Sequence, residues 1–302
     1  MYPSAIAALL CPVCAESFCA ESFRTQGPEH SPASAGTAAG SPALVCASGH
    51  TFDVAKQGYV NFLTGAGTSF LPDTAGMVAA REEFLSTGAY RPLADALATL
   101  VASKVSAGDL VLDAGTGTGY YLSAIQRAAD VTSIGLDISK FALRRAARAN
   151  PETVNLVWDV WRPLPIAANA VRAVVVIFAP RNAAEFARVL GPNSVLLVVT
   201  PLPGHLAEIA DEAGLLGVQP DKQEALESSL AEFFTPVSHQ NVEYYLLLGR
   251  EDVARAAMMG PAGHHLDPEV LRARVAFLPE QTTVAAKFRI SAFSALPAAH
   301  RQ

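Results

Sequence analysis

Short apolar runs alternate with helical patterns through the central part of the chain. Apolar runs that predict strands lie at 110–113, 132–137, 155–157, 173–178 and 194–200. Helical patterns follow at 120–129, 140–149 and 182–190. The runs at 173–178 and 194–200 are apolar without a break, as expected for strands covered on both faces. This alternation predicts an α/β fold with a parallel sheet and helices on both sides.

The regions beside this alternation extend the predicted domain to residues 76–302. Residues 76–104 have helical spacing that Gly88 interrupts, and residues 205–232 also read as helical. Two further runs, 242–249 and 284–293, predict strands that close one edge of the sheet. Residues 65–75 contain Gly and Pro and are predicted to be a linker.

The first 64 residues are predicted to form a separate module. Residues 25–43 (TQGPEHSPASAGTAAGSPA) are rich in Gly, Ser, Pro and Ala. They carry too few apolar side chains to fold alone, which predicts a flexible insertion within the module.

Two pairs of metal-binding side chains flank this insertion. Cys11 and Cys14 form a C-x-x-C pair, and Cys46 and His50 form a C-x-x-x-H pair. A C-x-x-C turn lets two thiolates reach one ion, and the second pair can supply the other two corners of a tetrahedron. A redox-active pair, or a chance pairing, is the alternative. The spacing favours a zinc site that stabilises a small module with few large apolar residues.

The decamer LVLDAGTGTG at 110–119 is the most informative stretch of the chain. A strand runs into Asp113, a turn follows with glycines at Gly115, Gly117 and Gly119, and a helix begins directly after it. Such a turn places backbone N–H groups beside a ligand. A second acid, Asp137, ends the next strand, where a carboxylate can accept hydrogen bonds from a ribose. Nicotinamide and flavin proteins use similar turns. The spacing D-x-G-x-G-x-G with the later acid resembles the S-adenosylmethionine pocket of Rossmann-like methyltransferases.

Composition narrows the function classes. The chain has 302 residues, 51% of them hydrophobic, and a formal net charge of −6. This charge argues against a broadly basic nucleic-acid coat, although it allows a local basic patch. No apolar run has the length needed to cross a bilayer, and the apolar N-terminus lacks the basic lead of a signal peptide. These features predict a cytoplasmic protein with reduced cysteines and no membrane partner.

Several segments together resemble the RlmA family of bacterial 23S rRNA guanine-N1 methyltransferases. The segments are CPVC, the C-x-x-x-H pair, FDVAKQGYVNFL (52–63), FLSTGAYRPL (84–93), the glycine turn, GLDISK (135–140), DVWRPLP (159–165), FAPRNAAEFARVL (178–190) and TPLPGHLAEI (200–209). The amino-acid sequences of the segments at 159–165 and 178–190 are most similar to the Gram-positive branch, which includes the tylosin-resistance methyltransferase. The resemblance covers nearly the whole chain apart from 24–44.

The resemblance implies a zinc-binding N-terminal domain joined to a Rossmann-like class I methyltransferase domain, and a homodimer with an RNA-binding cleft. It implies zinc ligands at Cys11, Cys14, Cys46 and His50, and S-adenosylmethionine contacts at Tyr90, Gly117, Thr118 and His205. The substrate it implies is a guanine in a hairpin loop of domain II of 23S rRNA, and in the Gram-positive branch the modification contributes to macrolide resistance.

Methyl transfer to guanine N1 needs the N1 proton to leave, and the sequence does not identify the base that accepts it. Asp159 and His205 are candidates, but Asp159 follows the third strand, where it is expected to accept from the adenine amino group. Tyr90 can contact the cofactor or pack as a core aromatic between two helices. Arg181 can contact RNA phosphate or pair with Glu185 one turn later.

Local charge suggests where RNA could bind. Arg144, Arg145 and Arg148 cluster on one predicted helix, and Lys56 lies in the zinc module; the alternative is a solvated charged face. Two other functions stay open: a small-molecule methyltransferase, and a zinc-dependent RNA-binding protein without catalysis.

Overall fold

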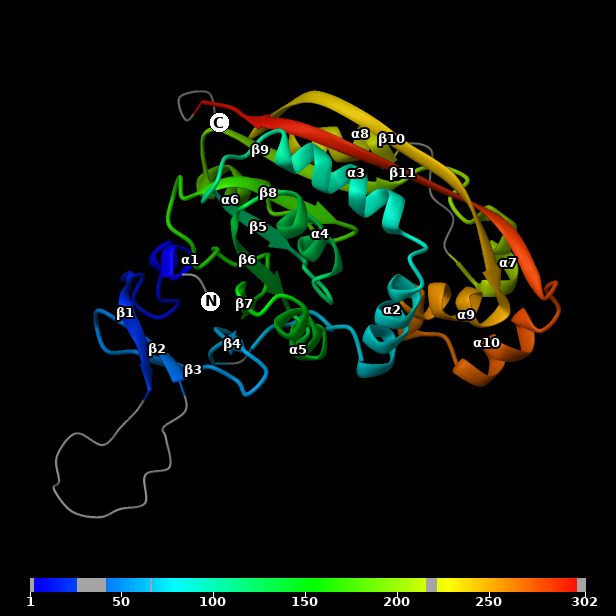
Figure 1. Ribbon diagram of the computed structural model, residues 1–302, viewed down its shortest axis with the longest axis horizontal. Coiled ribbons are helices and arrows are strands. Elements are labelled where there is room, and N and C mark those ends of the chain that lie inside the picture. The colour runs from blue at the N-terminus through cyan, green and yellow to red at the C-terminus, as the bar shows by residue number, and fades with distance from the viewer. Residues whose placement is uncertain (1–2, 26–41, 66, 216–221, 298–302) are drawn as a thin grey trace, which may run out of the picture.

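A mixed eight-stranded sheet forms the centre of the computed structural model, which describes residues 3–25, 42–65, 67–215 and 222–297 (Figure 1). Its strand order is β10-β11-β9-β8-β5-β6-β7-β4. The strands are β4 (Tyr59–Asn61), β5 (Leu110–Ala114), β6 (Thr132–Asp137), β7 (Val154–Val157), β8 (Val171–Ile177), β9 (Leu190–Pro201), β10 (Phe234–Gly249) and β11 (Gln281–Ala295). Neighbours from β4 to β9 are parallel, whereas β11 runs antiparallel to both β9 and β10.

Helices cover both faces of the sheet because the central strands are apolar on both. In β5, Val111 belongs to one buried cluster, while Leu110 and Leu112 belong to the other. The first cluster includes residues of α3 (Arg91–Ala102), α4 (Tyr120–Ala128), α9 (Arg250–Met258) and α10 (Pro268–Val275). The second includes residues of α1 (Pro3–Ala7), α6 (Ala183–Val189) and α8 (Lys222–Leu230). Helix α5 (Lys140–Ala149) packs against β7 and β4 in a third, smaller cluster.

The predicted alternation between 110 and 200 is confirmed, with boundaries that differ by a few residues. The predicted break at Gly88 is also confirmed. Gly88 lies between α2 (Ala75–Ser86) and α3, and its φ is +82°. On the sheet, the chain leaves β5 towards β6 on one side and later returns to β8 on the other. This reversal makes the carboxyl end of β5 a topological switch point, where open α/β sheets bind their ligands.

The predictions for the last hundred residues are only partly correct. The helical pattern predicted for 205–232 is confirmed in part: a 3₁₀ turn (Ala207–Ile209) and α7 (Ala210–Ala213) end at Gly214, whose φ is +65°, and α8 covers Lys222–Leu230. Residues 216–221 of that prediction lie outside the described residues. Strands β10 and β11 are longer than predicted, because β10 begins with a polar, exposed stretch that shows no apolar alternation. The helices α9 and α10 were not predicted.

The N-terminal segment contains a three-stranded antiparallel sheet of β1 (Phe18–Thr25), β2 (Pro42–Cys46) and β3 (Thr51–Asp53), shown in blue in Figure 1. The predicted flexible insertion at 25–43 is wrong at its ends, which lie in β1 and β2, where backbone pairing outweighs the loop-like composition; its residues 26–41 lie outside the described part. The segment is also joined to the large sheet. Strand β4 pairs with β7, and Ile6 and Leu9 belong to the second buried cluster. Independent folding of residues 1–64 and 76–302 stays a prediction.

Candidate functional site

The four predicted metal ligands lie together at the end of β2. The ligand atoms of Cys11, Cys14, Cys46 and His50 all lie within 4.8 Å of one another. The turn after Cys11 and the turn between β2 and β3 bring the two pairs to the same place. A stacked pair of aromatic rings, Phe18 and Phe62, lies in the same buried cluster as Cys11 and Cys46.

The spacing of these atoms fits a tetrahedral zinc ion. The Sγ atoms of Cys14 and Cys46 are 3.7 Å apart, and Nδ1 of His50 lies 3.4 Å from Sγ of Cys46 and 3.8 Å from Sγ of Cys11. Four ligands at the usual zinc distances would be separated by about 3.5 to 3.8 Å. Hydrogen bonding from the backbone of Glu16 lowers the pKa of the Cys14 thiol to about 6, which favours a thiolate there, whereas burial raises the pKa of the Cys11 thiol to about 11.

The glycine turn at 113–119 folds tightly against β6. The N–H groups of Gly115 and Thr116 both donate to the carbonyl of Leu136, at 2.8 and 2.9 Å. All three glycines have positive φ: +94° at Gly115, +55° at Gly117 and +79° at Gly119. A Cβ at Gly115 would lie 2.4 Å from Cβ of Ala179, so this position has room only for glycine. At Gly119 the conflict would be with Asn150, also at 2.4 Å.

The two predicted acids lie at the ends of neighbouring strands and have different environments. Asp113 is 1% exposed, and neither of its carboxylate oxygens has a hydrogen-bond partner within the described part of the chain. Burial raises its pKa to about 7; the Thr116 hydroxyl opposes the shift and the charge of Asp137 adds to it. A buried carboxylate without a donor fits a cationic group of a ligand, such as the ammonium of S-adenosylmethionine.

Asp137 holds the glycine turn from the side of β6. Its Oδ2 accepts from the N–H of Gly117 at 2.9 Å, and its Oδ1 accepts from the N–H of Ser139 at 2.7 Å. Burial raises its pKa, while the N–H of Ser139 and the guanidinium of Arg81 oppose that shift. The carboxylate is therefore placed at the switch point, directly beside the central glycine of the turn.

The structure brings Tyr90 and His205 into contact. The hydroxyl of Tyr90 lies 3.1 Å from Nε2 of His205, and the N–H of Lys287 donates to Nδ1 of His205 at 3.1 Å. Because Nδ1 accepts a hydrogen bond, the proton of the neutral ring is on Nε2, which donates to Tyr90. Tyr90 is 3% exposed and packs edge-on against Phe84 of α2 and Phe288 of β11. It therefore also belongs to the core, but these two rings come from a helix and a strand, not from two helices.

The predicted linker covers Asp159. The hydroxyl of Thr68 donates to Oδ2 of Asp159 at 2.8 Å, and the N–H of Trp161 donates to Oδ1 at 3.0 Å. Arg162, which lies 3.9 Å from the same carboxylate, also donates to the carbonyl of Gly67. No sequence pattern indicates this contact, because Thr68 and Asp159 are 91 residues apart.

Arg81 is a further residue of the site that sequence reasoning missed. Its guanidinium pairs with Asp73 at 2.6 Å and donates to the carbonyl of Met259 at 2.6 Å. A Cβ at Gly117 would lie 3.6 Å from it, so Arg81 reaches the glycine turn from α2. In the sequence, Arg81 appears only as one position of a predicted helix, and no pattern there indicates its contacts with Asp73 or Met259.

Other candidates take up different contacts. Thr118 is buried in the turn. The pairing of Arg181 with Glu185 is not observed, since Glu185 pairs with Arg188 at 2.7 Å.

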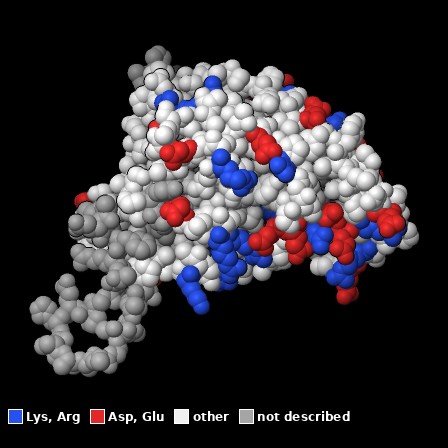
Figure 2. Space-filling model, in the orientation of Figure 1, with Lys and Arg blue, Asp and Glu red and all other residues white. Residues whose placement is uncertain are grey.

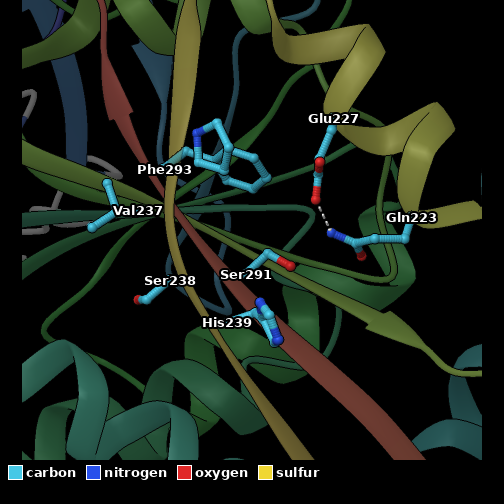
Figure 3. Close-up of a pocket in the computed structure, with 8 residues that line it drawn as sticks. Gln223, Glu227, Val237, Ser238, His239, Ser291 and Phe293 are labelled. Carbon is cyan, nitrogen blue, oxygen red and sulfur yellow. Dashed lines mark hydrogen bonds between the residues drawn. The ribbon is translucent and has the colours of Figure 1, made fainter.

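A small depression of about 120 Å³ between α8 and the β10–β11 pair includes none of the predicted site residues (Figure 3). Its Gln223 and Glu227 are bonded to each other, and its volume is too small for a nucleoside.

Two family models match the two parts of the chain. A model described as a methyltransferase domain matches residues 111–193, which contain the glycine turn and both acids. A zinc-ribbon model described as "RlmA, N-terminal" matches residues 38–64, which contain Cys46 and His50. Among the described residues, no helix is both long and apolar enough for a membrane span.

Similar proteins cover nearly the full length. A Micromonospora griseorubida protein named "Putative 23S rRNA (guanine-N(1)-)-methyltransferase" is 43% identical, over 97% of this chain and 99% of the relative. A Streptomyces fradiae protein named 23S rRNA (guanine(748)-N(1))-methyltransferase is 42% identical, over 82% of this chain and 90% of the relative.

A solved structure supports the fold alone. A chain from the complex of the Haloferax volcanii Trm112 methyltransferase activator matches with a TM-score of 0.50 at 18% identity, over 76% of this chain and 100% of that chain. The predicted class I methyltransferase fold with a zinc-binding N-terminal segment is thus confirmed, and S-adenosylmethionine and zinc are its cofactors. With relatives above 40% identity along most of its length, the chain belongs to the RlmA family of 23S rRNA (guanine-N1-)-methyltransferases.

Proposed function

We propose that this chain transfers the methyl group of S-adenosylmethionine to N1 of one guanine in 23S rRNA. The target we propose is the guanine for which the Streptomyces fradiae relative is named, nucleotide 748, in a hairpin loop of domain II. The observation that carries this proposal is the 43% identity to a relative over 97% of the chain, which spans both the Cys–His cluster and the glycine turn.

The residues at the switch point have distinct proposed roles. S-adenosylmethionine supplies an activated methyl group, so the protein's task is mainly to align and desolvate the reactants. Asp137 would accept from the ribose hydroxyls, with Gly115, Gly117, Thr118 and Gly119 forming the backbone cradle. Asp113 would face the ammonium group. Tyr90 and His205 would contact the methionine end, and Asp159 would accept from the adenine amino group in place of Thr68.

A basic surface on α5 supports contact with RNA. Lys140, Arg144 and Arg148 are exposed there, and Arg144 lies 5.6 Å from the ring centre of Phe141, which is 40% exposed. Figure 2 shows basic side chains gathered in the region of this helix, on a chain whose formal charge is −6. Arg145 is not free for RNA in the same way, because it pairs with Glu82 at 2.6 Å. Exposed Lys and Arg with an accessible ring suit a phosphate backbone.

The family resemblance supports three further proposals. The protein would act as a homodimer whose zinc-binding segments help to form the RNA cleft. It would act in the cytoplasm, where ribosomal RNA is modified. Its methylation would contribute to macrolide resistance, together with modification of a nearby nucleotide.

Primer extension on 23S rRNA tests the proposed function. N1 methylation blocks the Watson–Crick edge, so reverse transcriptase should stop at one guanine of the domain II loop. The stop should require both the protein and S-adenosylmethionine. Methylation of a small molecule without any rRNA stop would favour a small-molecule enzyme, and RNA binding without methyl incorporation would favour a non-catalytic role.

Because the carboxyl group of Asp113 titrates near neutral pH, we expect binding of S-adenosylmethionine to depend on pH. With a pKa near 7 in the free protein, Asp113 is mostly protonated at pH 6.0 and mostly ionised at pH 7.5. A cationic ligand favours the ionised form, so binding should release a proton at the lower pH. The dissociation constant should be about tenfold larger at pH 6.0 than at pH 7.5, since one pH unit below the pKa corresponds to a factor of ten.

Calorimetry in two buffers of different ionisation enthalpy measures both the affinity and the number of protons released. Asp113→Asn is the control: it should bind more weakly and lose most of this pH dependence. An unchanged pH dependence in Asp113→Asn would assign the linkage to another group.

A further inference from the structure

The segment from Phe178 to Asn182 crosses the carboxyl edge of the sheet. It follows β8, which pairs with β5. Ala179 lies so close to the glycine turn that a Cβ at Gly115 would be 2.4 Å from its own Cβ. At the other end, the side chain of Asn182 donates to the carbonyl of Val160 at 3.0 Å. The segment therefore lies between the glycine turn and the loop that contains Asp159.

Phe178 is held in an unusual conformation at this edge. Its φ is +54°, in the left-handed region that a bulky side chain rarely adopts. The ring contacts Tyr121 and Phe288 with centroids 6.4 and 5.7 Å away, yet the side chain is 46% exposed. Strained backbone of this kind is concentrated at functional sites, and an exposed ring is a surface on which a base can stack.

Arg181, three residues later, has no hydrogen-bond acceptor among the residues that the structure describes. It is half-buried, and no hydrogen bond or ion pair to its guanidinium exists within residues 3–25, 42–65, 67–215 and 222–297. The acid one turn away, Glu185, is already used by Arg188 and by the N–H of Leu164. Burial lowers the pKa of Arg181. A partly desolvated guanidinium favours an acceptor that a ligand supplies.

We propose that Phe178 and Arg181 form the subsite that holds the target guanine: Phe178 stacks on the base, and Arg181 donates to its O6 and N7. This inference rests on the proposed function. O6 and N7 are the acceptor pair that fits a guanidinium fork, whereas adenine presents a donor next to N7. A base must leave the RNA stack before N1 can reach the methyl donor, and an aromatic ring then replaces the lost stacking.

The same contact would assist the reaction. When N1 loses its proton to solvent, the negative charge is shared with O6, and Arg181 stabilises it there. N1 then bonds to the methyl carbon as the carbon–sulfur bond breaks, and its electron pair stays on sulfur. Arg181 should therefore lower the pH at which the bound guanine reacts.

A substrate-atom experiment tests the proposal. A domain II RNA fragment is made with 7-deazaguanosine at the target position, which removes only N7, and single-turnover methylation is measured at saturating S-adenosylmethionine. The wild-type rate should fall, but by less than the about 5- to 150-fold expected for loss of a whole bidentate contact to guanine, because the contact to O6 remains. Arg181→Ala loses both contacts, so it should be slowed by about 5- to 150-fold on normal RNA and should show little further loss with 7-deazaguanosine.

The pH profile and matched variants exclude a purely structural role. The rise of the rate with pH should move upward in Arg181→Ala, and Arg181→Lys should recover part of the shift. Arg91→Ala, at an arginine on α3 whose side chain is 79% exposed, is the matched control and should behave like wild type. Phe178→Leu should weaken RNA binding and methylation with little change in Tm, and Phe178→Tyr should restore both.

Two results would overturn the inference in different ways. If Arg181→Ala and the 7-deaza substitution reduce the rate independently, or if Arg181→Ala only changes the salt dependence of RNA binding, Arg181 contacts phosphate and the subsite is wrong. If the wild-type protein methylates no guanine in the normal fragment or in 23S rRNA, the proposed function itself fails and the inference fails with it.

Discussion

Replacement of Cys46 by serine is expected to reduce bound zinc from one ion per chain to almost none. Cys46 is 4% exposed, and its Sγ lies within 3.7 Å of the ligand atoms of both Cys14 and His50. A serine hydroxyl stays protonated at neutral pH and is a poor zinc ligand. Structural zinc sites contribute about 10–16 kcal/mol of apparent binding free energy, which is also folding free energy for the segment that holds the metal. The sheet of β1, β2 and β3 should therefore unfold.

Metal analysis of the purified protein and hydrogen exchange over residues 3–64 measure this effect. Cys19→Ser is a matched control, because it removes a thiol that lies outside the predicted ligand set. It should keep one zinc ion per chain and normal protection. Full zinc occupancy in Cys46→Ser would show that the cluster does not bind metal through this thiolate.

Replacement of Gly115 by alanine is expected to abolish binding of S-adenosylmethionine, with an affinity loss of at least about 100-fold. The new Cβ would meet Cβ of Ala179 at 2.4 Å, and both belong to packed backbone segments that cannot move apart without shifting β5 or the start of the 178–182 segment. Overpacking of this kind costs about 1–3 kcal/mol, and the φ of +94° adds a further penalty for a residue with a Cβ. The turn would relax away from the geometry that presents its N–H groups.

The Gly108→Ala variant separates the steric conflict of a new Cβ from the backbone strain of a positive φ. Gly108 has a similar φ of +82°, but no atom of the described residues outside its immediate neighbours lies within 4 Å of the position of its Cβ. This variant should lose some stability through backbone strain and keep its affinity for S-adenosylmethionine. Equilibrium dialysis with labelled cofactor and thermal unfolding distinguish the variants. Equal affinities in Gly115→Ala and wild type would contradict the role of the turn as the cofactor cradle.

The parts of the fold with strong periodicity could be predicted from the sequence. The runs from 110 to 200 are apolar and bounded by glycines and helix caps, so their local signals agree with the final sheet. The start of strand β10 could not be predicted from the sequence, because its first half is polar. Pairing with β11 along the whole of β10 holds this half in the sheet. Backbone pairing between distant segments leaves no periodic signal in either one.

The site also combines features that local sequence signals predict with contacts between distant segments that they do not predict. The glycine turn and Asp137 could be predicted, since one short segment and one strand end define them. The contacts between Tyr90 and His205, 115 residues apart, and between Arg81 and Met259, 178 residues apart, arise only when the chain folds. Within the described part of the chain Arg181 has no partner, which also depends on its surroundings, and the nearby Glu185 made pairing a reasonable alternative.

The most direct test of the account is the identity of the nucleoside that the protein produces. Purified protein is incubated with 23S rRNA and S-adenosylmethionine carrying a labelled methyl group, and the RNA is digested and its nucleosides are analysed by mass spectrometry. The label is expected in 1-methylguanosine, at about one residue per rRNA molecule. Label in another nucleoside, or an active cofactor-binding protein that leaves the rRNA unlabelled, would contradict this expectation.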